Sequence, residues 1–484
     1  MEPTNVRPFP TGLGATSRRE SWPLIRLALP ICGAQLAQAG MSVVDIMMTG
    51  RQSATDLAAV SVGASLWMPL MLFMTGTLMG LTPIVAQLLG GGRQAGIRPN
   101  VHQALWVGLV LGLVSALLLR LAVAPVFAWM EVPPEVAERA HDYVGAVAFG
   151  MPGVAIFLAL RAFSDGVNHT RPALWISLIG LAVNIPSNYV LIYGGDGFTR
   201  LLGDATPGWL ADLPALGAYG CGIATAIAMW VMTLAMVRYT QKSRAYGSIE
   251  LWHSPTRPNP RMIAELLYVG VPIGVAIFVE VTLFTLIALF IASLGEIVVA
   301  AHQVALNYTS VLFMLPLSLG MALTVRVGNT LGGGDPRLAR LVAWNGILIA
   351  LLVALFNSLL LWLTAETIVG LYTHNVEVQA LTLSLVGLAM LYQVSDSLQV
   401  ALAGALRGYK DTRVIMFITL LAYWLVGLGG GHLLGRYGVG DWIEPMGVHG
   451  YWIGLIAGLT VAALLLGERF RRKARSVARR AEDG

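Results

Sequence analysis

The chain contains twelve apolar runs, each long enough to cross a lipid bilayer as a helix. Because no water reaches the hydrocarbon layer, a spanning segment must pair its own backbone groups, so the predicted fold is an all-α membrane protein. The composition, 56% hydrophobic and 12% charged, is far from that of a soluble domain. We expect spans at 24–48, 58–89, 102–124, 143–163, 172–193, 218–239, 262–294, 298–331, 338–363, 378–403, 413–434 and 447–468.

Basic residues are distributed unevenly between the predicted loops. If the N-terminus is cytoplasmic, 26 of the 31 lysines and arginines fall on the cytoplasmic side, with Arg161 and Arg407 counted among them. Short basic loops resist translocation, so both termini are predicted to be cytoplasmic. The net charge of +5 then reflects loops that contact anionic membrane lipid, and it does not indicate nucleic acid as a partner.

Sliding the sequence against itself by 242 residues reveals an internal repeat. Residues 85–92 fall on 327–334, and Gly166 falls on Gly408. This register predicts two six-helix lobes related by a pseudo-twofold axis along the membrane normal. The expected parts are a cytoplasmic tail over 1–23, an N-lobe over 24–239, a cytoplasmic linker over 240–261, a C-lobe over 262–468 and a basic cytoplasmic tail over 469–484.

Three carboxylates, Asp45, Glu280 and Asp396, lie inside the apolar runs, and none has an acidic counterpart in the other half. A charge at the centre of a spanning helix costs roughly 2.5–3.5 kcal/mol, so we interpret the three acids as the coupling groups of an ion-coupled transporter. We expect them to share one shielded vestibule between the lobes, where cargo and driving ion compete for them. For Asp45, an interfacial acid that reaches water is the alternative.

Amide and hydroxyl side chains accompany the acids. Asn184 and Asn188 share one helical face, and with Asp45 and Thr225 they could serve a proton relay or bind a hard cation. The same two amides could instead form a hydrogen-bonded clasp between helices.

Other polar residues are cavity candidates. Tyr392, one turn before Asp396, could bond that carboxylate, stack on a cationic cargo or simply pack. Gln303 and Asn307 share a face and could line a cavity, whereas His302 could be merely solvated.

Several other activities lack the residues they need. The triple glycines at 90–92 and 332–334 could suggest phosphate binding, but no lysine follows a glycine, so we expect neither an ATP site nor another cofactor. We find no nucleophile elbow and no histidine cluster at membrane depth, which argues against an enzyme. The duplication favours alternating access over a passive channel. Gly76-x-x-x-Gly80 predicts close helix packing.

Eight short segments, spread over the chain between its tails, form a recognisable set. They are Val43–Gly50, Leu57–Ser61, Pro83–Gln87, Arg161–Gly166, Asn184–Asn188, Phe278–Phe284, Val299–Asn307 and Leu406–Asp411. Together they resemble the multidrug and toxic compound extrusion family, and within it the NorM-type bacterial transporters. The resemblance implies an inner-membrane antiporter, expected to work as a monomer, that exports cationic, often aromatic drugs and dyes in exchange for inward Na⁺ or H⁺.

The resemblance also implies roles for individual residues. Asp45, Glu280 and Asp396 occupy positions implicated in ion coupling and drug binding, and Asn184, Asn188 and Tyr392 match accompanying positions. Na⁺ could then bind at Glu280 and Asp396, or at Asp45 with the two asparagines. Some relatives carry an acid in place of Asn188, so the N-lobe site of this chain holds one carboxylate only.

A lipid or polysaccharide-precursor flippase on a related two-lobed scaffold is the alternative function. Such a protein is expected to place several cationic residues in its cavity to bind pyrophosphate. The charges predicted at membrane depth in this chain are acidic, which favours cationic cargo.

Overall fold

The computed structural model describes residues 13–203, 206–438, 442 and 444–482. Within this part of the chain, twelve helical segments are long and apolar enough to cross a membrane, which confirms the predicted fold class. The α-helices are α1 Leu13–Gln52, α2 Ala54–Met79, α3 Leu81–Gly90, α4 Ile97–Trp129, α5 Pro134–Gly166, α6 Arg171–Leu202, α7 Gly208–Ala211, α8 Gly217–Lys242, α9 Pro260–Ala292, α10 Glu296–Gly332, α11 Pro336–Tyr372, α12 Val376–Gly408, α13 Thr412–Leu420 and α14 Val448–Glu482.

Polar residues and prolines determine where several of these helices begin. The side chain of Asn259 accepts hydrogen bonds from the backbone of Arg261 and Met262, and Pro260 occupies the first turn of α9. Asp335 and Pro336 begin α11 in the same way. Such caps satisfy N–H groups that have no partner inside the helix, and proline loses nothing there because it has no N–H. Helices α2 and α3 together form one span, and π-helical turns extend α13 to Tyr437.

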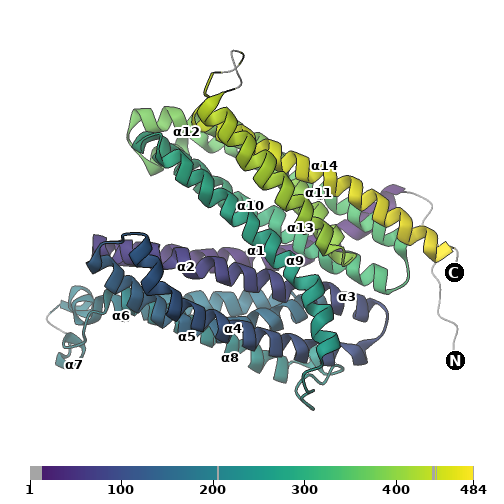
Figure 1. The fold of residues 1–484 in the computed structure, drawn as a ribbon. Helices are drawn as coiled ribbons and strands as arrows, with labels where there is room; N and C mark the ends of the chain where they lie inside the picture. The colour runs from purple at the N-terminus through teal and green to yellow at the C-terminus, as the bar shows by residue number, and fades with distance from the viewer. Residues whose placement is uncertain (1–12, 204–205, 439–441, 443, 483–484) are drawn as a thin grey trace.

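The helices form two groups (Figure 1), which we call the N-lobe (α1–α8) and the C-lobe (α9–α14). Each group has its own buried apolar core, except that the first helix of each half reaches into the other. Leu24 of α1 packs in a C-lobe core, and Leu266 of α9 packs in the N-lobe core. These two leucines are exactly 242 residues apart, so the exchange obeys the internal repeat.

Successive spans run in opposite directions, so their connections alternate between two ends of the bundle. We call one end the basic end; its connections are 91–96, 167–170, 243–259, 333–335 and 409–411. We call the other the acidic end; its connections include 130–133, 203–216, 293–295 and 373–375. In Figure 1 the basic end lies near α3 and the C-terminal end of α14, and the acidic end lies near α7.

Small residues bring the two lobes into contact. A Cβ added to Gly76 of α2 would lie 2.5 Å from the Cα of Gly274 in α9, and one added to Gly80 would lie 2.6 Å from the Cα of Gly270. The close packing predicted for Gly76-x-x-x-Gly80 is therefore confirmed, and its partner is a second motif of the same spacing.

A second interlobe contact closes the basic end. The segments 85–92 of the N-lobe and 327–334 of the C-lobe, which we call the seam, are the two segments that the repeat superimposes. Gln87 Nε2 donates to the carbonyl of Gly408 at 2.8 Å, and its repeat counterpart Asn329 donates through Nδ2 to Asn168 Oδ1 at 2.8 Å. The seam thus follows the pseudo-twofold symmetry.

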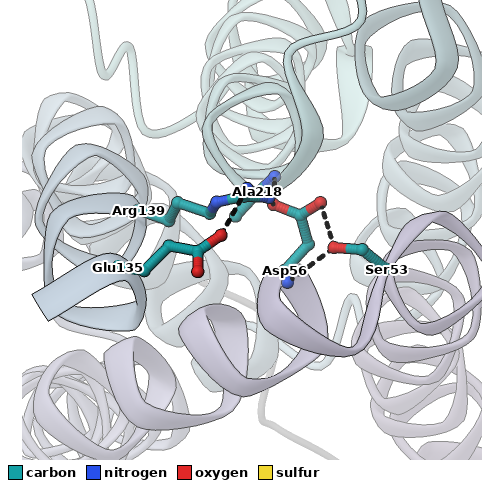
Figure 2. A network of polar contacts seen from close by, with 5 residues as sticks. All are labelled: Ser53, Asp56, Glu135, Arg139 and Ala218. Atoms are coloured by element: carbon teal, nitrogen blue, oxygen red, sulfur yellow. Dashed lines mark hydrogen bonds and ion pairs between the residues drawn. The ribbon is translucent and has the colours of Figure 1, made fainter. Parts of the chain in front are cut away.

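A polar network joins three N-lobe helices at the acidic end (Figure 2). The Ser53 hydroxyl caps α2 by accepting from the Asp56 backbone N–H at 2.9 Å, and it donates to Asp56 Oδ2 at 2.6 Å. Asp56 Oδ1 accepts from Arg139 Nη1 of α5 at 3.1 Å and from the backbone N–H of Ala218 in α8 at 3.0 Å. One buried carboxylate therefore fixes the starts of α2 and α8 against α5.

The substitution Asp56→Ala should destabilise the N-lobe by about 2–3 kcal/mol, because it leaves the buried backbone N–H of Ala218 without its acceptor and removes one of the two acids that pair with Arg139. A lower melting temperature of the purified protein in detergent would report the loss. The matched control is Glu135→Gln, which removes the other, more exposed partner of Arg139 and should change the melting temperature little. Equal effects of the two variants would contradict the role assigned to Asp56.

Candidate functional site

The N-lobe gathers one polar cluster around Asp45, which is buried in α1. Asp45 Oδ1 accepts from Asn184 Nδ2 at 3.1 Å and from Asn188 Nδ2 at 2.5 Å, both on α6. Thr225 Oγ1 of α8 donates to Oδ2 at 3.0 Å. The structure thus brings together the four residues that the sequence grouped, and Asp45 is not an interfacial acid. The three donors replace part of the hydration that a buried carboxylate loses.

A small cavity of about 60 Å³ adjoins this cluster and is lined by Asp45, Asn184 and Thr225 together with Gln38, Ser42 and apolar residues of α1, α2, α5 and α8. It has room for a water molecule or a monatomic cation but not for a drug. The Oδ1 atoms of Asn184 and Asn188 are buried, and neither has a hydrogen-bond partner in the described part of the chain. Rotating either amide would add an oxygen ligand beside the carboxylate, so the donor set fits a hard cation.

A larger cavity of about 330 Å³, which we call the central cavity, lies between the lobes. Residues of α1, α2, α3 and α5 line it from the N-lobe, and residues of α9, α10 and α12 from the C-lobe. Its walls are mainly apolar, with aromatic and thioether side chains that suit flat organic molecules. These walls include Leu72, Met79, Leu158, Ile277, Phe284, Phe313, Met314, Leu317 and Met321.

Four charged side chains also line the central cavity: Arg161, Asp165, Glu280 and Arg407. Arg161 Nε lies 3.8 Å from Asp165 Oδ2 one turn along α5, and its Nη2 donates to Gln35 Oε1 at 2.8 Å. Across the cavity, Glu280 interacts electrostatically with Arg407, whose Nε has no hydrogen-bond partner among the residues that the structure describes. The cavity is therefore lined by two basic and two acidic side chains.

Asp396 is 1% exposed and lies in the C-lobe core. Among the described residues, no side chain meets its carboxylate oxygens with full hydrogen-bond geometry; the Tyr392 hydroxyl interacts with the carboxylate more loosely, and the charge of Asp396 interacts with that of Glu280. Tyr392 is also buried, with its ring 6.4 Å from that of Phe284 and 6.1 Å from that of Trp452. Tyr392 therefore packs among aromatic rings while its hydroxyl interacts with the Asp396 carboxylate.

The remaining cavity candidates lie elsewhere on α10. Gln303 and Asn307 are exposed, and neither lines the two cavities described above. The expectation that His302 is solvated is wrong: its side chain is buried, and Nδ1 accepts from Trp452 Nε1 at 3.1 Å.

The structure corrects two further expectations. The acids do not share one vestibule, because Asp45 faces a cavity inside the N-lobe whereas Glu280 lines the central cavity. Arg161 and Arg407 are not loop residues, since both are buried in helices and contribute positive charge at the central cavity. The sequence did contain a hint of the charges at the central cavity, because the 242-residue register aligns Asp165 of the N-lobe with Arg407 of the C-lobe.

Among the described residues, no three His, Cys, Asp or Glu side chains are arranged to hold a metal ion.

Comparisons with known proteins agree with this architecture. A family profile described as MatE matches residues 30–190 and 272–431, one segment in each half of the repeat. The chain is 43% identical over 479 residues to multidrug resistance protein PmpM of Pseudomonas aeruginosa, with coverage of 99% of this chain and 97% of that protein. It is 42% identical over 454 residues to multidrug resistance protein NorM of Vibrio cholerae serotype O1, with coverage of 93% and 95%.

A solved structure shares the fold at lower sequence similarity. It is described as the outward-facing conformation of a multidrug resistance MATE family transporter of the MOP superfamily. The TM-score is 0.84 at 18% identity, with coverage of 98% of this chain and 100% of that one. The match extends over both lobes.

Proposed function

The chain belongs to the MatE family and is a multidrug efflux transporter, and from this premise we propose that it exports cationic, often aromatic drugs and dyes by antiport with inward Na⁺ or H⁺. The observation that carries the proposal is the central cavity, where the carboxylate of Glu280 stands among aromatic and thioether walls. Such walls accept flat apolar groups of varied shape, and the carboxylate attracts a positive charge.

The sizes of the two cavities support a division of roles. About 330 Å³ is within the range of small-molecule sites, whereas about 60 Å³ suits only a water or a single ion. We assign the cargo to the central cavity and a coupling cation to Asp45, Asn184, Asn188 and Thr225. Glu280, whose charge interacts with that of the buried Asp396, is the second place where a proton or Na⁺ competes with the cargo.

Competition for these carboxylates would couple the two flows. The lobes rock about the central cavity and open it alternately at the basic and acidic ends, and the seam closes the basic end in this structure. Each net charge that moves inward at about 150 mV is worth roughly 3.5 kcal/mol, which sustains a drug gradient of a few hundredfold. No nucleotide site enters this scheme.

The same proposal includes location and assembly. We place the protein in a bacterial inner membrane with the basic end in the cytoplasm, since basic connections are retained on that side. Each chain contains both lobes and both cavities, so a monomer has every part that the scheme requires.

Arg161 and Arg407 give the flippase alternative a specific observation in its favour, because cationic side chains do line the central cavity. Each has an acid nearby, Asp165 or Glu280, so the cavity lacks the purely cationic lining that would bind a pyrophosphate best. This mixed lining keeps drug export as the preferred function.

Ethidium export by the purified protein in proteoliposomes tests the proposal. We expect export to require an inward Na⁺ or H⁺ gradient, and a series of pH values with and without Na⁺ identifies the ion. Export that persists after both gradients are dissipated would exclude antiport. Translocation of a pyrophosphate-linked polyprenyl lipid, without ethidium export, would instead support the flippase.

A further inference from the structure

A third cavity, of about 420 Å³, lies at the basic end where the two lobes meet. We call it the seam cleft. Three arginines from three helices line it: Arg26 of α1, Arg171 of α6 and Arg326 of α10. Among the described residues that line the cleft, none is acidic. Arg26 and Arg171 therefore add positive charge to the cleft, although elsewhere at the basic end several arginines pair with acids.

The side chains of Arg26 and Arg171 are exposed in the cleft, and no ion pair among the described residues involves either one. Partial burial lowers the pKa of His169, which also lines the cleft, so its ring is neutral at neutral pH. The guanidinium groups thus supply the positive charge. Arginine is well suited to phosphate because its planar group can donate two parallel hydrogen bonds.

Aromatic residues show at which level of the membrane the cleft opens. Trp22 and Tyr239 line it and are 67% and 41% exposed. Tryptophan and tyrosine with exposed rings at the ends of spanning helices are typical of the layer of lipid headgroups. The cleft therefore faces headgroups, with the apolar surface of the spans directly beside it, and basic pockets between spanning helices bind anionic lipids in this layer.

We propose that the seam cleft binds the phosphate of an anionic phospholipid, with Arg26 and Arg171 as its ligands. The cleft is coupled to closure of the basic end, because Asn168 in its wall accepts the hydrogen bond from Asn329 of the seam. A headgroup bound by Arg26 and Arg171 bridges α1 and α6 beside Asn168, and so favours the conformation in which Asn168 accepts the hydrogen bond from Asn329 of the seam. Lipid binding does not depend on the proposed export function; only the effect on transport does.

The test compares lipid retention by the purified full-length protein in nanodiscs that contain phosphatidylglycerol or only phosphatidylcholine. The double substitution Arg26→Gln with Arg171→Gln should lower retention of phosphatidylglycerol by about tenfold or more, and Arg26→Lys with Arg171→Lys should retain most of it. The matched control is Arg337→Gln with Arg472→Gln, because both residues lie at the basic end outside the cleft and pair with acids. The control should retain the lipid as the unmodified protein does.

Two results would overturn the proposal. One is unchanged retention in the double glutamine variant, checked for correct folding by its melting temperature. The other is complete displacement of the lipid by millimolar inorganic phosphate, which would make a soluble anion the ligand. Lipid retention is measured without transport, so its result can be interpreted even if the export proposal fails.

Discussion

Replacement of Glu280 by glutamine should abolish drug-stimulated ion uptake, because the variant preserves the shape of the side chain and loses the charge for which cargo and driving ion compete. Glu280 lines the central cavity and forms no close ion pair with any residue that the structure describes, whereas the other acid there, Asp165, lies beside Arg161 on the same helix. We expect a fall of about 100-fold or more, at the upper end of typical coupling between two sites. Ion uptake into proteoliposomes on addition of ethidium measures it.

The substitution Asp396→Asn should have the same effect on coupling without loss of stability. A buried carboxylate beside a second acid, Glu280, costs folding free energy, so its neutral analogue should melt at the same or a higher temperature. Loss of transport by a variant of undiminished stability points to function and not to misfolding.

The control for both variants is Glu265→Gln, on the same helix as Glu280. Glu265 is exposed at the basic end, where it pairs with Lys410, and its neutralisation should leave coupling intact. Normal export by both Glu280→Gln and Asp396→Asn would mean that the competition scheme is wrong.

Much of this architecture could be predicted because hydropathy and an internal repeat both act on long segments. Apolar runs of membrane length allow few alternatives to helices, and a single register over half the chain predicts which helices are equivalent. The Asp45 cluster was also predictable, since a buried carboxylate needs donors and Asn184, Asn188 and Thr225 were the polar side chains at hand. The prediction of this cluster depends on polar side chains that are costly to place in hydrocarbon without a partner.

The parts that were missed depend on how helices pack. Arg161 and Arg407 lie near helix ends, where hydropathy cannot separate a loop arginine from one that turns into a cavity. The separation of Asp45 from Glu280 depends on which helix faces point inward, and the repeat offset alone does not contain that information. The exchange of Leu24 and Leu266 between the lobes likewise required the tertiary structure.

Substitution of the seam glycines Gly90 and Gly332 is the other change for which we expect a large effect. A Cβ added to Gly332 would lie 2.0 Å from the carbonyl oxygen of Gln87, and one added to Gly90 would lie 1.9 Å from that of Asn329. These are equivalent clashes under the repeat, and both are with backbone atoms, so no side chain can rotate out of the way. The helices must separate, and overpacking of this kind costs roughly 1–3 kcal/mol.

Gly90→Ala and Gly332→Ala should therefore each shift the protein toward a conformation in which the basic end is open. A cost of about 1–3 kcal/mol changes the ratio of two conformations by roughly 5- to 150-fold, which is enough to depopulate the closed state if the two are of similar energy. Spin labels at cysteines replacing Arg93 and Arg337, which are exposed on either side of the seam, would report the separation as a longer interspin distance. The native Cys32 and Cys221 are buried.

The symmetry of the seam makes the prediction stringent. Because Gly90 and Gly332 are repeat counterparts, the two variants should lengthen the interspin distance to a similar extent and slow ethidium export together. Gly387→Ala is the matched control, since an added Cβ there meets nothing within 4 Å, and it should change neither quantity. If Gly90→Ala and Gly332→Ala leave the distance distribution as it is, close backbone contact at the seam does not hold the basic end shut. If only one variant lengthens it, the seam does not act symmetrically in the transport cycle.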